Sequence, residues 1–442
     1  MMMRRFVLPV LVCACAAAQD VVRMDHVVQS YVTSGQFMGS VLVARGNEIL
    51  LNKGYGFANL EWNIPDSPQT KFRLGSMTKQ FTAACILLLE ERGKLKTDDP
   101  IAKYMPDAPA AWQKITFFHL LTHTSGIPSF TGFPDYASLE PFATTPEKLV
   151  ARFRDKPLEF QPGEKFSYSN SGYVLLGYLI EKIGGEPYAK FIQENIFTPL
   201  GMKDSGYDSN SAIIPHRASG YTNGGNGPEN AGFIHMSIPF SAGALYSTTE
   251  DLLRWEQALF AGKVLSEASL QKMTTPFKEN YAFGLVVTED KGRKVIQHGG
   301  GIEGFNTSMR YEPSEKLTVV VLGNLNGPAP DEISQKLAAL AHGEQVQLPS
   351  ERREIAVSEA ILKQYVGVYE LAPGVDITFS LEGNQLMAQV TGQPKFPLFA
   401  ETETKFFLKV VDRQIEFFRD ASGKVTYIIL HQAGIDHKAV RK

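Results

Sequence analysis

Stretches with strand character stand at both ends of a long helical middle, and this order constrains the fold more than any other feature. Residues 39–45 and 48–57 have the pattern of strands joined by a turn at Gly46 and Asn47. Residues 95–280 have mainly the pattern of helices and of loops rich in glycine and proline. Four further strands are predicted near 282–288, 293–298, 305–312 and 317–323, and flanking helices at 20–34 and 331–342. The order predicts an α+β domain, in which helices cover an antiparallel sheet and a helical subdomain is inserted.

A chain of 442 residues is too long for a single core, and its last part changes character. Residues 345–358 are polar and contain Pro349, so we expect a linker there. Short strands then alternate with turns, at 367–371, 375–382, 385–390, 405–409, 414–419 and 425–431. We expect the first domain to span residues 19–344, and residues 359–442 to form a small all-β domain, a barrel or a sandwich.

The first 18 residues have the composition of an export signal. Arg4 and Arg5 precede a short apolar run, and small residues follow up to a cleavage site predicted after Ala18. We therefore expect a signal peptide at 1–18 and a secreted or periplasmic protein. A lipid anchor at Cys13 or Cys15 is less favoured, because the residues before them match such a site poorly.

Charge and hydropathy argue against a nucleic-acid partner and against a membrane span. The formal net charge is −3, with no basic block, which argues against nucleic acid. After the signal, no segment is long and apolar enough to predict a membrane span.

A serine and a lysine lie one helical turn apart in the sequence Ser76-Met77-Thr78-Lys79. Apolar residues with helical spacing follow them, so the pair stands at the start of a helix, with Lys79 on the same face as Ser76. Serine is a poor nucleophile until a base lies beside it, and lysine can be that base if desolvation lowers its pKa. The helix start also favours a developing oxyanion. The pattern indicates an activated serine, but Ser269 and Lys272 repeat it in a polar sequence that predicts an ordinary surface helix.

Tyr168-Ser169-Asn170 precedes an apolar helix that is predicted at 171–183 and stopped by two glycines. A tyrosine at a helix entrance can hold its phenol in a cleft, and Asn170 can accept from a lysine and donate to a substrate carbonyl. Serine and asparagine are also common where helices begin, so these residues alone do not indicate a site.

A histidine followed by three glycines, His298-Gly299-Gly300-Gly301, follows a predicted strand. The glycines let a substrate backbone approach the strand edge, where a free N–H can serve as an oxyanion donor. His298 would supply a donor, and a full positive charge only when protonated. An ordinary glycine-rich turn is the alternative for this run.

Together, these three elements resemble the S-x-x-K, Y-x-N and K/H-x-G motifs of the serine β-lactamase and penicillin-binding protein superfamily, over roughly residues 25–345. The branch resembled is that of class C β-lactamases, with its D-Ala-D-Ala carboxypeptidase, D-aminopeptidase and esterase relatives. The resemblance implies a β-lactamase/transpeptidase-like fold and an appended C-terminal domain that is a lipocalin-like β-barrel. The order of the motifs makes Ser76 the nucleophile, because Ser269 comes too late in the chain.

The family's roles follow the motifs onto this chain. The resemblance implies that Ser76 is acylated while Lys79 and Tyr168 share the proton transfers, with the identity of the base left open. Asn170 would orient Lys79 and the substrate amide, and the N–H groups of Ser76 and Gly301 would form the oxyanion hole. The remaining substrate-binding positions would be His298, Gly299 and Gly300. Many members have lysine in place of His298, so tight binding of a penicillin carboxylate is in question.

We therefore expect an exported serine hydrolase that cleaves peptides or amides, including those with D-residues, or esters. The alternatives are a class C-type β-lactamase and a non-catalytic ligand binder. His119 and His123 are four residues apart, but without an H-E-x-x-H pattern they predict loop packing, and we expect no metal or other cofactor. The expected partner is a small-molecule or peptide substrate, with oligomers forming through the C-terminal domain as a further expectation.

Overall fold

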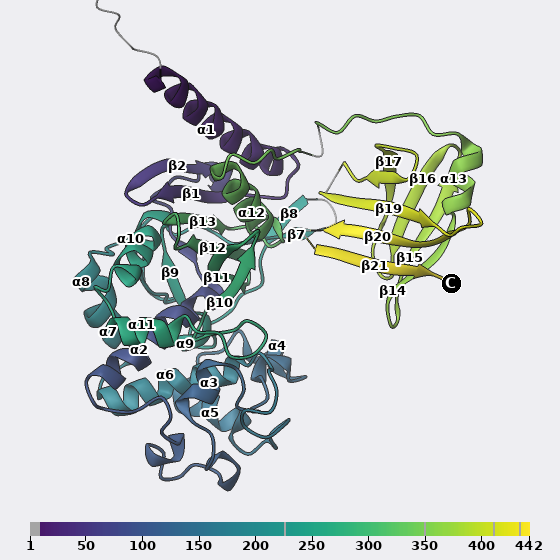
Figure 1. The fold of residues 1–442 in the computed structure, drawn as a ribbon. Helices are drawn as coiled ribbons and strands as arrows, with labels where there is room; N and C mark the ends of the chain where they lie inside the picture. The colour runs from purple at the N-terminus through teal and green to yellow at the C-terminus, as the bar shows by residue number, and fades with distance from the viewer. Residues whose placement is uncertain (1–8, 225–226, 349–350, 410–411, 433–434) are drawn as a thin grey trace, which may run out of the picture. The chain divides into compact units, whose positions relative to one another are not determined.

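The computed structural model describes residues 9–224, 227–348, 351–409, 412–432 and 435–442. The chain divides into two compact units, one up to Gly343 and one from Glu344 (Figure 1). Part of the predicted signal peptide lies outside the described residues. From Pro9 onward it forms the beginning of α1, so the helix predicted at 20–34 begins earlier than expected.

The first unit is built on a six-stranded antiparallel sheet in the order β10-β11-β12-β13-β1-β2. Its strands are β1 (Gly39–Arg45), β2 (Glu48–Tyr55), β10 (Val286–Asp290), β11 (Arg293–Ile302), β12 (Phe305–Glu312) and β13 (Leu317–Gly323). β1 pairs with β13 from Gly39 opposite Gly323 to Arg45 opposite Leu317. The two ends of the predicted domain therefore meet in the middle of one sheet.

The central strands are covered on both faces. Every residue of β13 is buried, and its apolar run has no polar alternation, as expected of a strand with two packed faces. Val320 and Leu322 join the core formed with α2 (Thr78–Glu91) and α10 (Thr249–Phe260). The alternate residues Val319 and Val321 are buried as well. α1 (Pro9–Thr33) and α12 (Ala329–Ala341) pack together against the sheet (Figure 1).

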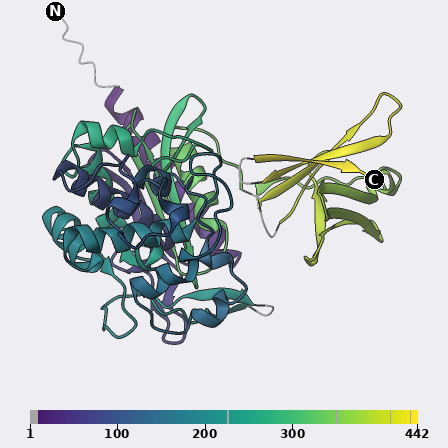
Figure 2. The same ribbon diagram turned by 90° about the horizontal axis from the view of Figure 1, so that it is seen from below.

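The helical middle leaves and rejoins this sheet. Its helices are α3 (Phe117–Leu121), α4 (Tyr136–Leu139), α5 (Pro146–Arg154), α6 (Asn170–Gly184), α7 (Tyr188–Ile192), α8 (Thr198–Leu200), α9 (Phe240–Gly243) and α11 (Glu267–Met273). α3, α4, α5 and α6 lie together below the sheet in Figure 1 and in front of it when the unit is seen from below (Figure 2). α2 is buried along most of its length between this layer and the sheet, so residues at its start are held from both sides.

Short strand pairs complete the unit, and the structure departs from the prediction there. β3 (Phe57–Asn59) pairs with β4 (Ile64–Pro65), and β7 (Tyr221–Gly224) pairs with β8 (Gly227–Asn230). A third small sheet has three strands, in which β9 (Leu245–Ser247) lies between β5 (Phe72–Arg73) and β6 (Gly206–Tyr207). These strands have two to four residues each, too short for a recognisable polarity pattern in the sequence.

The second unit is a closed eight-stranded barrel, which confirms the predicted all-β fold. A short helix, α13 (Glu359–Tyr365), precedes the strands. They are β14 (Gly367–Ala372), β15 (Val375–Glu382), β16 (Gln385–Val390), β17 (Lys395–Ala400), β18 (Lys405–Phe407), β19 (Arg413–Arg419), β20 (Val425–Gln432) and β21 (Ile435–Arg441). Aromatic rings fill its interior, where Tyr365 stacks on Phe417 at 4.1 Å between ring centroids. β17 and β21 were not among the predicted strands.

Candidate active site

Ser76 lies in a short 3-10 turn, η1 (Gly75–Met77), that leads directly into α2. Gly75 has a φ of +54°, and a β-carbon there would come within 2.9 Å of the Gly301 nitrogen. Only glycine permits both this backbone conformation and this close approach. The Thr307 hydroxyl also donates to the Leu74 carbonyl at 2.9 Å, which fastens the chain before the turn to β12. The sheet and the helix start therefore hold Ser76 between them.

The Lys79 side chain is fully buried and donates three hydrogen bonds from Nζ. The acceptors are Ser76 Oγ, Asn170 Oδ1 and the Ala242 carbonyl, each at 2.9 Å. No carboxylate is among these partners. Burial alone lowers the pKa of the Lys79 ammonium well below its usual value.

These contacts suit the neutral amine as well as the ammonium. A neutral amine has two N–H groups and one lone pair. If the N–H groups go to the fixed oxygens of Asn170 and Ala242, the lone pair faces the Ser76 hydroxyl. The geometry can therefore take a proton from Ser76.

Tyr168 and Asn170 reach the site from the start of α6. Ser169 caps this helix, since its hydroxyl accepts from the Gly172 N–H. Asn170 is held by Ser129 Oγ, which accepts from its N–H at 3.1 Å, and by Thr131 Oγ1, which accepts from Nδ2 at 3.1 Å. The helix that was predicted to begin after Asn170 therefore includes this residue. The side-chain oxygen of Asn170 faces Lys79.

The Tyr168 ring lies beside the lysine, with Lys79 Nζ 4.8 Å from the ring centroid. The side chain is 38 % exposed, but the ring also packs on buried groups. Desolvation raises the pKa of the phenol, and its hydrogen bond with Ser76 acts in the opposite direction. The net shift is upward, so Tyr168 is a phenol and not a phenolate at neutral pH.

The His123 ring packs against the Tyr168 ring, a contact that the sequence did not predict. Its ring lies 4.2 Å from that of Tyr168, and its Nδ1 accepts from the Ser169 N–H at 3.1 Å. Burial and the nearby Lys79 and His298 keep the pKa of His123 well below its usual value, so the ring is neutral. His119 instead caps α3 with Thr116. The two histidines therefore do not share a site.

The glycine run lies on β11 past the end of its pairing with β10. That pairing runs only to Gln297, whereas β12 pairs with β11 as far as Ile302. The edge from His298 to Gly301 therefore faces the turn that carries Ser76, with the backbone of Gly301 lying close to Gly75. Gly299 and Gly300 lie in the same edge segment. The arrangement can present backbone N–H groups of Ser76 and Gly301 to one oxygen atom.

His298 does not offer the charge that a carboxylate-binding residue would. Its Nδ1 lies 2.5 Å from the Gly299 carbonyl, which can only accept, so this nitrogen carries the proton. Nε2 then accepts from the Tyr281 hydroxyl at 3.0 Å. Burial, together with Lys79, lowers the pKa of His298 to about 4. At neutral pH the ring is uncharged, and both its nitrogens are used within the protein.

The catalytic cavity is small and has few charges. Its lining includes Gly75, Ser76, Phe130, Thr131, Tyr136, Asn170, Ile234, Pro239, Ala242, Gly243, Gly301, Ile302 and Glu303. Its empty volume, including the part open to solvent, is about 430 Å³. Glu303, in the turn after β11, is its one acidic lining residue and was not singled out from the sequence, because a glutamate before a glycine is an ordinary hairpin pair.

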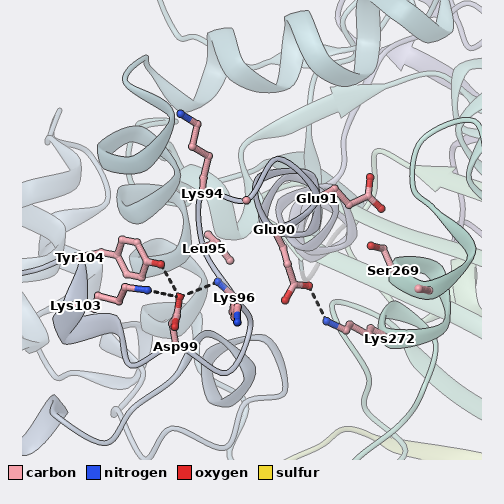
Figure 3. A pocket seen from close by; sticks show the side chains of 12 residues that line it. Glu90, Glu91, Lys94, Leu95, Lys96, Asp99, Lys103, Tyr104, Ser269 and Lys272 are labelled. Atoms are coloured by element: carbon pink, nitrogen blue, oxygen red, sulfur yellow. Dashed lines mark hydrogen bonds and ion pairs between the residues drawn. The ribbon is translucent and has the colours of Figure 1, made fainter.

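The second Ser-x-x-Lys sequence lies in another pocket, on α11 (Figure 3). Lys272 Nζ points to the Glu90 carboxylate at 2.9 Å, and its side chain is 49 % exposed. The Ser269 hydroxyl accepts from Ser266 Oγ at 3.2 Å. The serine and the lysine thus have separate partners, because Ser269 shares hydrogen bonds with Ser266 and Glu91 whereas Lys272 pairs with Glu90.

Among the described residues, no group of three or more His, Cys, Asp or Glu side chains is arranged to hold a metal ion. Within the same part of the chain, no helix has the length and apolar character needed to cross a membrane.

Comparison with known proteins supports the resemblance noted in the sequence. The family model described as Beta-lactamase matches residues 24–344, and one described as a domain of unknown function (DUF3471) matches residues 351–441. Penicillin-binding protein 4* of Bacillus subtilis (strain 168) is 31 % identical over 440 residues, which cover 92 % of this chain and 95 % of that protein.

Two solved structures extend the comparison. The octameric penicillin-binding protein homologue from Pyrococcus abyssi has a TM-score of 0.67 and 28 % identity, covering 96 % of this chain and 100 % of that one. A D-stereospecific amidohydrolase from Streptomyces sp. has a TM-score of 0.61 and 26 % identity, covering 74 % of this chain and 97 % of that one.

Proposed function

Since the chain belongs to the Beta-lactamase family, we propose that it is a serine hydrolase that forms an acyl-enzyme on Ser76 and cleaves amides, peptides or esters. One observation carries the proposal: the buried amine of Lys79 lies 2.9 Å from Ser76 Oγ and has no acidic partner. A buried lysine that has a lowered pKa and no carboxylate partner reduces the stability of the folded protein, which favours a catalytic role over a structural one.

In the first step, Lys79 Nζ takes the proton of Ser76 as Oγ attacks the substrate carbonyl carbon. Asn170 and Ala242 keep the amine directed at the hydroxyl, as their two hydrogen bonds require. The negative charge that develops on the carbonyl oxygen is stabilised by the N–H groups of Ser76 and Gly301 and by the start of α2.

The leaving group then needs a proton. Tyr168 is suited to deliver it, because its raised pKa keeps the phenol protonated and its hydroxyl contacts Ser76. The ammonium of Lys79 then gives its proton to the resulting phenolate, so the phenol and the neutral amine are both restored when the acyl-enzyme has formed. Water attacks the ester in the second step, its proton passes to the same pair, and Ser76 leaves as the hydroxyl.

The substrate class is narrowed by the neutral His298. A substrate carboxylate at the β11 edge would meet no charged imidazole above about pH 4. This weakens the alternative of a β-lactamase, because penicillins and cephalosporins carry such a carboxylate. The named relatives include an amidohydrolase as well as penicillin-binding proteins, which is consistent with an amide or ester substrate.

Export and assembly are further parts of the proposal. The N-terminal sequence supports a secreted or periplasmic protein. An assembly of several copies is supported by the similar Pyrococcus abyssi protein, which is described as octameric, and we propose that such an assembly forms through the second unit.

The test is a panel of β-lactams, D- and L-amino-acid amides, and short-chain esters. Intact mass measures the adduct on the protein, and product assays measure turnover. We expect an acyl adduct and turnover with amides or esters, and neither with Ser76→Ala. Equal activity in Ser76→Ala would show that another group is the nucleophile, and adducts that never turn over would favour the non-catalytic binder.

A further inference from the structure

Glu303 holds a carboxyl group at a fixed place in the wall of the catalytic cavity. It lies in the two-residue turn between β11 and β12, and it lines the cavity together with Ser76. Asn326 fastens both sides of this turn, because Oδ1 accepts from the Gly304 N–H at 2.8 Å and Nδ2 donates to the Ile302 carbonyl at 3.1 Å. The carboxyl therefore stands on a rigid support, as a specificity residue requires.

The carboxyl of Glu303 is incompletely paired. Oε2 is enclosed by protein and has no hydrogen-bond partner. A second carboxyl, that of Glu140 at the end of α4, acts on it, and the two side chains share a hydrogen bond. Burial and the charge of Glu140 raise the pKa of the Glu303 carboxyl. Two neighbouring acids with an unused buried oxygen are the arrangement that a cation would complete.

The charged groups nearby do not supply that cation. Arg73 is close enough to act on Glu303. Its guanidinium, however, donates to Asp208 at 2.7 Å, and the same carboxylate also binds Arg217. Tyr136, the other titratable group that faces the pair, responds with a raised pKa, because burial and the two carboxyls disfavour its phenolate.

We propose that Glu303, with Glu140, binds the ammonium group of an amine-bearing acyl donor, so that the preferred substrates are amides or esters of amino acids with a free amino group. This inference rests on the proposed function, and it adds the residues that choose the substrate. An ammonium in the cavity that Glu303 lines would give the carboxyl pair the charge-assisted hydrogen bond that the neighbouring protein groups do not supply. At the opposite side of the cavity the uncharged His298 does not require a carboxylate on the leaving group.

The experiment compares pairs of substrates that differ only in the amino group. Phenylalanine p-nitroanilide, as D- and L-enantiomers, is paired with 3-phenylpropionic acid p-nitroanilide, and the readout is the ratio of their kcat/KM values. We expect the parent protein to favour one amino enantiomer over the des-amino compound by about 10- to 100-fold, the worth of a hydrogen bond to a charged group. In Glu303→Gln the ratio should fall to near unity. In Glu289→Gln, a control that removes an exposed carboxyl on β10, the ratio should stay as in the parent.

The pH dependence gives a second readout that a merely structural role would not produce. The ratio of kcat/KM values for the amino and des-amino substrates should rise with pH as the carboxyls of Glu303 and Glu140 ionise. It should fall again as the substrate amine loses its proton, near about pH 8. A ratio that is unchanged in Glu303→Gln while turnover still depends on Ser76 would overturn the inference and leave the proposed function standing. A parent that hydrolyses neither compound of a pair, nor any member of the wider panel, would overturn both.

Discussion

The chain contains two Ser-x-x-Lys sequences on helices, and their surroundings differ in every respect that matters for catalysis. Lys79 is fully buried, with three neutral acceptors that include Ser76. Lys272 is half exposed and paired with Glu90, while Ser269 faces Ser266. A carboxylate partner stabilises the ammonium, so Lys272 has no reason to give up its proton.

The difference teaches that the motif supplies only the spacing. In the proposed mechanism, the activation of Ser76 comes from groups that are distant in the sequence. They are Asn170 and Ala242, which direct the amine, and the β11 edge beside the turn of Ser76. At Ser269 the corresponding neighbours are the acidic end of α2 and its following loop (Figure 3).

The largest contrast is expected when each serine is replaced. Ser76→Ala removes the atom that would be acylated, and hydrolysis should fall by at least about 10³-fold. Ser269→Ala removes a hydroxyl that contacts Ser266 and Glu91 but is not paired with Lys272, and activity should stay within about twofold of the parent. Initial rates on the best substrate of the panel, together with intact mass, measure both. A loss of activity in Ser269→Ala with Ser76→Ala still active would invert the assignment.

The second contrast concerns the two lysines. Lys79→Arg keeps a cation but provides no base, because guanidinium does not deprotonate in proteins, so the rate should fall by about 10² to 10⁴. In the parent, kcat/KM should rise with pH as Lys79 loses its proton, in a range well below the usual lysine pKa.

The matched variant is Lys272→Arg, which can keep its ion pair with Glu90. It should retain both the rate and the pH profile of the parent. A rate in the parent that rises only near about pH 10, the usual lysine pKa, would contradict a lowered pKa of Lys79, and a Lys79→Arg variant as fast as the parent would contradict Lys79 as the base.

The sequence was informative where a single element carries the feature. Ser76 and Lys79 lie one turn apart on one helix, so their spacing alone predicted the contact between them. Tyr168 and Asn170 stand at one helix start, but it was the resemblance to the family's motifs that predicted their place beside Lys79. The strands of the central sheet were predicted from single elements, since β1 and β13 are uninterrupted apolar runs.

Features that depend on packing between elements were not predictable in this way. The partners of His298 decide its charge, and Tyr281 lies 17 positions away in the sequence. His123 was interpreted as a loop residue because nothing in its neighbourhood indicates that Tyr168 stacks on it. β17 contains Pro397 and β21 has few apolar residues, so neither has the alternation by which a strand is predicted.

A third contrast concerns stability. Burial lowers the pKa of Lys79 in the folded protein, so the unfolded chain binds a proton that the folded chain lacks, and this cost grows as the pH falls below the usual lysine pKa. Lys79→Met removes the cost while keeping the volume. We expect an inactive protein that is more stable by about 1 kcal/mol at neutral pH, with a gain that is larger at about pH 6 than at about pH 9. Thermal unfolding midpoints at the two pH values measure this, and a gain that does not depend on pH would contradict a lowered pKa.

The smallest effect is expected at the other lysine. Lys272→Met breaks the ion pair with Glu90, but the lysine is half exposed, and Glu90 keeps the hydrogen bonds that Thr97 donates to its other oxygen. An exposed pair of this kind contributes about 0.2 to 1 kcal/mol, and salt screens it. The variant should therefore unfold within a few degrees of the parent, with a difference that shrinks as salt is added and activity that is unchanged. A loss of several kcal/mol, or a loss of activity, would mean that Lys272 is coupled to the catalytic helix through Glu90, and the two Ser-x-x-Lys sites would then not be independent.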